Sequence, residues 1–214
     1  LFAYKSFTNN VKGFTALENW VKKLANPDVP VRFVMEATGV YHESLAYYLD
    51  DHGLEVSIIT PNKISNYART LDVKTVTDKT ASEAITLFGL ERNLEKWKRP
   101  NSLFKRLRQL TRERDQLVQL RTIAKNQLHA ELVEAEPNSS SVARMKKQIA
   151  FFNKQELEIS SEIVELSKQD EKVSGAIKII CSLPGVGMLT AVTVLAETNG
   201  FELIRNKRQL TSYA

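Results

Sequence analysis

The stretch VRFVMEATG, residues 31–39, joins a short β-branched and aromatic run to an acidic residue and a turn. Apolar runs of this length that are bounded by turn residues are typical of buried strands. We therefore expect a strand over residues 31–35 that stops at Glu36. A carboxylate at the end of a buried strand is costly to bury without a partner. Glu36 is thus a candidate functional residue, with a turn or cap role as the alternative.

The sequence around this strand alternates between strand and helix patterns. Helix signals are present at residues 11–24, 41–52 and from Pro61 onward, and strand-like runs at residues 1–6, 31–35 and 54–60. Gly53 is expected to end the second of these helices, because glycine readily adopts the left-handed conformation that closes a helix. This order predicts an α/β layer over residues 1 to about 95.

A different period begins after residue 100. Apolar residues follow alternating steps of three and four at Val142, Met145, Ile149, Phe152, Ile159, Ile163, Leu166, Val173 and Ile177, with Glu156 and Asp170 in the two remaining positions. The same rhythm precedes them from Leu103 to Leu128, and residues 136–141 form a polar turn in which Ser141 is a candidate N-cap. The pattern predicts a long antiparallel coiled-coil hairpin. Because one apolar stripe buries little by itself, we expect copies of the chain to associate through it as a dimer or tetramer.

Residues 179–214 contain a third pattern, in which Pro184, Gly185 and Gly187 separate two apolar helical segments. Glycines at a helix start leave backbone N–H groups open to a phosphate, which the helix N-terminus also attracts. We interpret the segment as a helix-hairpin-helix that binds the DNA backbone through Gly185 and Gly187. A plain pair of helices joined by a glycine turn is the alternative.

Positive charge is concentrated in one segment. The chain carries 30 Lys and Arg against 25 Asp and Glu, a net charge of +5, but residues 96–125 alone hold 10 basic and 2 acidic residues, or +8. A polyanion is the expected partner, with a solvated basic helix face as the alternative. The candidate nucleic-acid contacts are Lys96, Lys98, Arg99, Lys105, Arg106, Arg108, Arg112 and Arg114. Trp97 either stacks on a base or packs at a domain junction.

Several classes of protein and site are excluded. The composition, 43% hydrophobic and 26% charged, is that of a folded globular protein. No apolar run approaches the roughly 20 residues of a membrane helix, so no membrane partner is expected. The single cysteine, Cys181, excludes an internal disulfide and a multi-cysteine zinc site. Without a secretion signal the expected location is the cytoplasm, and three histidines in separate segments give little support to a histidine metal site.

A second candidate acid lies in residues 74–84, KTVTDKTASEA. Phosphoryl transfer with two metal ions requires several carboxylates that converge on one point. Asp78 stands at a loop-to-helix junction, where its side chain could join such a group or act as an N-cap.

The order of these motifs resembles the DEDD-type insertion-sequence transposases, which are related to the Piv DNA invertases. The resemblance rests on residues 36–41, 60–62, 74–84, the coiled coil and residues 183–187, with further matches at 196–197 and 208–210. It implies a RuvC-like, RNase-H-fold domain whose four acids bind Mg²⁺ or Mn²⁺. It further implies a coiled coil for assembly, a C-terminal transposase domain with a serine nucleophile, and a structured bridge RNA that guides the recombination of DNA.

Carried over by position, Glu36 matches the second acid of the family and Asp78 the third, as catalytic and metal-binding residues. The fourth acid is expected at position 81, one helical turn after Asp78, where this sequence has Ala81. Glu83 lies roughly 140° further round the helix than Asp78 and is a poor substitute. The first acid is expected in a strand before Leu1 and the serine motif after Ala214, so the RuvC-like domain is expected to lack its first strand.

We therefore expect a DNA recombinase of an insertion sequence with three domains, at residues 1–98, 99–178 and 179–214. Its partners would be DNA, bridge RNA and further copies of the chain. Because of Ala81, the chain is expected to be an inactive or partial form, either an inactivated variant or a decayed element. The alternative is a noncatalytic nucleic-acid-binding assembly protein built on the coiled coil.

Overall fold

The computed structural model describes residues 3–71, 75, 77–204 and 206–211. The chain divides into two compact units, Leu1–Arg99 and Pro100–Ala214. No helix within the described ranges is long and apolar enough to cross a membrane.

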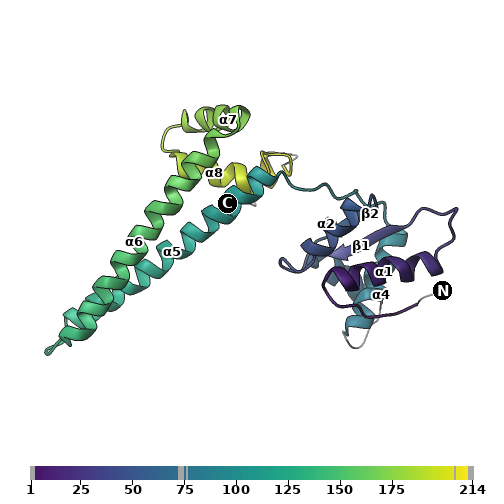
Figure 1. The fold of residues 1–214 in the computed structure, drawn as a ribbon, viewed down its shortest axis with the longest axis horizontal. Helices are drawn as coiled ribbons and strands as arrows, with labels where there is room; N and C mark the ends of the chain where they lie inside the picture. The colour runs from purple at the N-terminus through teal and green to yellow at the C-terminus, as the bar shows by residue number, and fades with distance from the viewer. Residues whose placement is uncertain (1–2, 72–74, 76, 205, 212–214) are drawn as a thin grey trace. The chain divides into compact units, whose positions relative to one another are not determined.

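The first unit is a small α/β layer (Figure 1). Its elements are α1 (Val11–Leu24), β1 (Arg32–Glu36), α2 (Glu43–Asp51), β2 (Glu55–Ile59), α3 (Pro61–Ala68), the short 3₁₀ helix η1 (Arg69–Leu71) and α4 (Asp78–Glu91). The two strands are parallel, with Arg32 opposite Glu55 and Glu36 opposite Ile59. The predicted order of strands and helices from residue 11 onward is therefore confirmed, and both carboxyl ends of the strands lie at one edge of the sheet.

The two faces of this sheet are covered by different helices. Phe33 and Val56 point toward α2, where Ala46 and Leu49 are fully buried. The opposite face meets α4 at Gly89, where a Cβ atom would come within 2.9 Å of the Val34 side chain. Gly89 thus allows α4 to lie directly on β1.

Two local features of this unit follow from sequence chemistry. Gly53 follows His52, the C-cap of α2, and has φ +69°, as expected for the residue that closes a helix. The predicted strand over residues 1–6 is wrong for residues 3–6, which form no strand. The ladder of the described residues contains only β1 and β2, and Phe7, just after this segment, packs on Trp20 with ring centroids 5.6 Å apart.

The regular elements in the described part of the second unit are all helices. Its elements are α5 (Ser102–Leu132), α6 (Ser139–Lys168), α7 (Glu171–Cys181), α8 (Met188–Glu197) and α9 (Lys207–Thr211). The long helices α5 and α6 form an antiparallel hairpin, with α7 and α8 at its base (Figure 1). Leu107 of α5, Ile163 of α6 and Leu195 of α8 share one buried core.

The apolar period of this hairpin ends earlier than predicted. The seam was expected to continue to Ile177, but α6 ends at Lys168 and a separate helix, α7, begins at Glu171. Asp170 is the N-cap of α7 and its carboxylate accepts hydrogen bonds from the backbone N–H groups of Lys172 and Val173. The polar residue in the heptad is therefore a helix start, and this part of the prediction is wrong.

The start of α6 also differs from the prediction. Asn138, not Ser141, is the N-cap, and its side-chain oxygen accepts from the N–H groups of Ser140 and Ser141 at 3.0 and 3.2 Å. Asparagine and serine are both strong N-cap residues, and here the first of them along the chain begins the helix.

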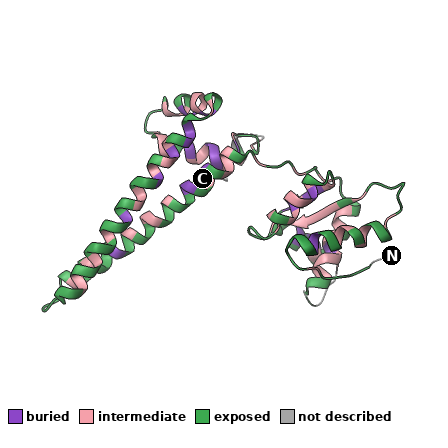
Figure 2. Ribbon diagram, in the orientation of Figure 1, coloured by how far each residue is buried: buried purple, intermediate pink, exposed green. Residues whose placement is uncertain are grey.

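Burial in the second unit is densest at the base of the hairpin (Figure 2). Ile163 is fully buried there, whereas Ile123, on the other long helix, is 53% exposed. We expect Ile163→Val to lower the free energy of unfolding by about 0.5–1.5 kcal/mol, because it removes a packed methylene group. The matched variant Ile123→Val should change it by less than about 0.5 kcal/mol. Urea unfolding measures both, and equal effects would contradict the burial described here.

Candidate functional site

Glu36 is the last residue of β1, at the carboxyl edge of the sheet. The backbone N–H of Ala37 donates to the carbonyl of Ile59 at 2.8 Å, so pairing with β2 continues to this point. The chain then turns through Gly39, which has φ +53°. The Glu36 carboxylate is half-buried and has no hydrogen-bond or ion-pair partner among the described residues. Its side chain therefore does not cap the turn, and ligands of open parallel sheets bind at this edge.

The Glu36 side chain shares a face of the sheet with Val34, since residues two apart in a strand point the same way. That is the face covered by α4, because Val34 contacts Gly89 of that helix. The candidate acids Glu36 and Asp78 therefore belong to one strand and to the helix that packs on it.

Asp78 is the first residue of α4, and its side chain is exposed. Thr77 is the N-cap: its hydroxyl accepts from the Thr80 N–H at 3.2 Å, and the Thr80 hydroxyl accepts from the Thr77 N–H at 2.9 Å. This reciprocal pair makes an N-cap role for Asp78 unnecessary, and that alternative is wrong. Ala81 follows one turn later on the same side of the helix.

These two carboxylates have the chemistry of a magnesium site. Mg²⁺ is commonly bound by one or two carboxylates together with waters and substrate phosphates, and Glu36 and Asp78 are acids without a salt-bridge partner among the described residues. Ala81 offers no ligand atom. No group of three or more His, Cys, Asp or Glu side chains placed to hold a metal ion occurs in the described part of the chain. The residue types suit such a site, but no contact among the described residues brings the two carboxylates together, so a shared metal site stays a prediction.

The basic residues of α5 lie against acids that are distant in sequence. Arg112 makes a bidentate pair with Glu197 of α8, both distances 2.7 Å, and this pair raises the pKa of the arginine. Glu156 of α6 is 15% exposed and accepts from two arginines. The remaining predicted contacts on this helix, Lys105 and Arg108, are half-buried. The ion pairs are Arg106–Glu162 at 2.9 Å, Arg112–Glu197, Arg114–Glu156 at 2.7 Å and Arg121–Glu156.

The segment before α5 belongs to the first unit. Trp97 packs on Tyr47 with ring centroids 5.5 Å apart and joins the core beneath α2, so its indole is a packing residue and is not presented for stacking. Arg99 donates to Asp50 at 3.0 Å and to Asp51. Lys96 and Lys98 are exposed and make no ion pair with any described residue.

Gly185 and Gly187 lie in the exposed turn between α7 and α8. Gly185 has φ +83°, a conformation that favours glycine. Gly187 is the N-cap of α8. Because glycine has no side-chain acceptor, it makes no capping hydrogen bond to the first backbone N–H groups of that helix. Leu183, in the same turn, is 57% exposed. Two helices joined by an exposed glycine turn are present as predicted, and a helix-hairpin-helix role in DNA binding stays a prediction.

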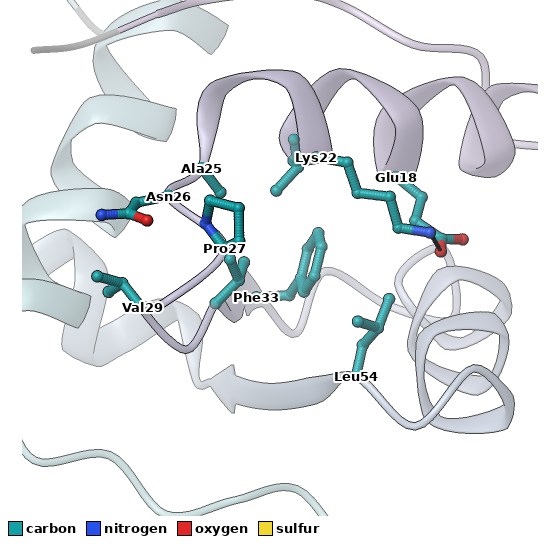
Figure 3. Close-up of a pocket in the computed structure, with 10 residues that line it drawn as sticks. Glu18, Lys22, Ala25, Asn26, Pro27, Val29, Phe33 and Leu54 are labelled. Carbon is teal, nitrogen blue, oxygen red and sulfur yellow. Dashed lines mark hydrogen bonds and ion pairs between the residues drawn. The ribbon is translucent and has the colours of Figure 1, made fainter.

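A cavity of about 230 Å³ lies away from these candidate residues (Figure 3). It is lined by the end of α1, by Phe33 and by Leu54, which precedes β2, so it opens at the amino end of the strands, opposite Glu36. The Glu18–Lys22 ion pair borders it, and the hydrogen bond from Lys22 lowers the pKa of Glu18. Its lining is mostly apolar and offers no cluster of ligand atoms.

Comparisons with known proteins cover nearly the whole chain. The pilin gene-inverting protein of Moraxella bovis is 26% identical over 210 residues, which is 98% of this chain and 63% of that protein. The protein of the same name from Moraxella lacunata matches with the same figures. The chain therefore spans about 63% of the length of these curated relatives.

Two family models also match. One, described as a transposase and built on the DEDD transposases of IS110, covers residues 1–137, well over half of the chain. The second, described as "Transposase IS116/IS110/IS902 family", covers residues 177–214. The chain therefore belongs to the IS110 family of DEDD transposases, with a distant similarity to the pilin gene-inverting proteins.

Proposed function

We propose that the chain is the larger part of a DNA recombinase that moves an insertion sequence by metal-dependent strand cleavage and exchange. The family membership supports this reaction, and so does the name of the relatives, which invert a gene. The observation that carries the proposal is Glu36, a carboxylate at the carboxyl edge of two parallel strands that has no partner among the described residues.

The first unit would be a RuvC-like, RNase-H-fold catalytic domain. Its two parallel strands with helices on both faces support that architecture. We propose domains at residues 1–98, 99–178 and 179–214, as the sequence predicts, and note that residue 178 lies within α7.

Glu36 and Asp78 would hold Mg²⁺ or Mn²⁺ at the face shared by β1 and α4. A bound divalent ion would stabilise charge on a phosphoryl oxygen and favour a reactive oxygen nucleophile. The role of this chain is to present the half-buried Glu36 carboxylate and the exposed Asp78 carboxylate to the ion. Asp78 is suited to this, because a negative charge at the first turn of a helix is favoured by the helix dipole.

The second unit would bind nucleic acid and assemble copies of the chain. The turn with Gly185 and Gly187 would hold the DNA backbone, and the basic residues of α5 would contact DNA or a structured bridge RNA. Assembly through the coiled-coil hairpin is supported by its exposed apolar residues. These are Leu120, Ile123, Phe151 and Leu157, between 47% and 70% exposed.

Ala81 favours a second candidate function. A methyl group cannot bind a metal ion, so the chain would bind nucleic acid and assemble without cutting DNA at an appreciable rate. In this candidate the chain binds duplex DNA and RNA with steep salt dependence but binds Mn²⁺ weakly.

The test uses the protein encoded by the complete gene, with bridge RNA and a supercoiled plasmid that carries donor and target sites. We expect strand exchange in the Ala81→Asp variant with Mg²⁺, no exchange with EDTA, and recovery when excess Mg²⁺ is restored. Ribonuclease treatment should also abolish exchange. Exchange that persists in EDTA would overturn the metal-dependent reaction, and exchange that persists after ribonuclease would overturn RNA guidance. DNA binding without exchange under every condition would favour the noncatalytic candidate.

A further inference from the structure

Residues 93–99, which we call the strap, run beside β2 in the first unit. The backbone N–H of Trp97 donates to the Val56 carbonyl at 2.7 Å, and the Ser57 hydroxyl donates to the Glu95 carbonyl at 2.9 Å. Residues 95 and 97 therefore both direct backbone groups to β2. Contacts from every second residue are typical of an extended chain that runs along a strand.

Two side chains of the strap attach it to α2. Trp97 packs on Tyr47 and joins the core around Leu49. Arg99 donates to the Tyr47 carbonyl at 3.1 Å and to the carboxylates of Asp50 and Asp51, and its guanidinium lies 4.5 Å from the centroid of the Tyr47 ring. The charge of Arg99 is thus paired with two carboxylates, and these contacts hold the strap against α2.

Lys96 and Lys98 alternate with these attached residues and are exposed. Because side chains alternate along an extended chain, the two lysines point away from α2, toward the face of the sheet on which α4 packs. They are about 7 Å apart along the chain. Arg112 and Arg114 of α5, by contrast, lie within 2.7 Å of carboxylate oxygens.

We infer that Lys96 and Lys98 bind phosphates of duplex DNA and that Arg99 is the positioning residue of the strap. This deepens the proposed function and rests on it, since the lysines lie on the same face as Glu36 and the helix that begins at Asp78. DNA that passes these acids would meet the strap. Trp97 is packed and offers no ring to an unstacked base, as RNA recognition commonly requires, so the contact is with the backbone and carries no sequence preference.

The inference is tested by measuring duplex DNA binding at a series of salt concentrations. The protein is the one encoded by the complete gene, and fluorescence anisotropy reports the bound fraction. The variant K96Q/K98Q should reduce the slope of log K against log salt by about 1.8, since each lost phosphate contact contributes about 0.9. At 0.1 M salt this corresponds to an affinity loss of about tenfold to a hundredfold. The matched control K12Q/K23Q removes two exposed lysines of α1 and should leave the slope within about 0.5 of wild type.

Arg99→Gln separates positioning from direct contact. If Arg99 holds the strap, the slope stays within about 0.5 of wild type, while the Trp97 amide exchanges its hydrogen faster. A slope reduced by about 0.9 without faster exchange would make Arg99 a phosphate contact and overturn its assignment.

The lysine assignment fails if K96Q/K98Q binds duplex DNA like wild type, or if its loss is confined to structured RNA of equal length. Either result leaves the proposal of metal-dependent strand exchange standing, because that proposal is tested separately by the effect of EDTA on exchange. A wild-type protein that binds no DNA would overturn both proposals.

Discussion

Replacing Ala81 with aspartate is expected to tighten Mn²⁺ binding by about tenfold to a hundredfold. The figure is taken from the loss of metal affinity when a residue that hydrogen-bonds to a metal ligand is mutated. Strand exchange should rise by a comparable factor. Ala81 lies one turn after Asp78 on α4, on the same side of the helix, so the new carboxylate would join the existing one. Manganese binding followed by electron paramagnetic resonance and strand exchange on supercoiled plasmid measure the two effects.

The control for this variant is Ser82→Asp. It adds the same charge one residue later, about 100° further round the helix, where the carboxylate cannot approach a metal held by Asp78 in the same way. Equal Mn²⁺ affinity in both variants would mean that added negative charge, not geometry, is responsible. The assignment of position 81 to the metal site would then be wrong.

From residue 11 onward, the helices and strands of the first unit could be predicted from sequence because their signals are local. The apolar run before Glu36, the glycine at position 53 and the proline at position 61 each act within a few residues, and the elements begin or end at or beside them. The second unit was less predictable where two local signals competed. Asp170 fits the heptad as a polar interruption, but its carboxylate accepts two backbone N–H groups, and that ends α6 and starts α7.

The candidate site divides in the same way. The positions of Glu36 at a strand end and Asp78 at a helix start could be predicted because both signals are local, whereas their assignment to a metal site comes from the family resemblance and stays a prediction. The acid partners of the basic helix could not be predicted, because Glu156 and Glu197 are 42 and 85 residues from the arginines they contact. Glu156 also explains a gap in the heptad: the polar side chain at that position accepts hydrogen bonds from Arg114 and Arg121. A local count of charge therefore overstates what α5 presents to a polyanion.

Glu36→Gln in the Ala81→Asp background is expected to reduce strand exchange by about a thousandfold. A bound metal supplies several kcal/mol of transition-state stabilisation, and each 1.36 kcal/mol corresponds to about tenfold in rate. Glutamine keeps the shape of the side chain and a carbonyl oxygen but removes the charge. Because Glu36 makes no ion pair or hydrogen bond with a described residue, unfolding by urea should change little, which separates lost chemistry from lost structure.

The matched control is Asp28→Asn, which neutralises an exposed acid in the loop between α1 and β1. This loop is at the amino end of β1, away from the edge where Glu36 lies, so exchange should stay within about twofold of the parent. DNA affinity should be unchanged in both variants, because the lysines of the strap are untouched. If Glu36→Gln supports exchange at the rate of Asp28→Asn, the carboxyl edge of the sheet is not the catalytic centre, and the reaction must depend on acids outside this strand.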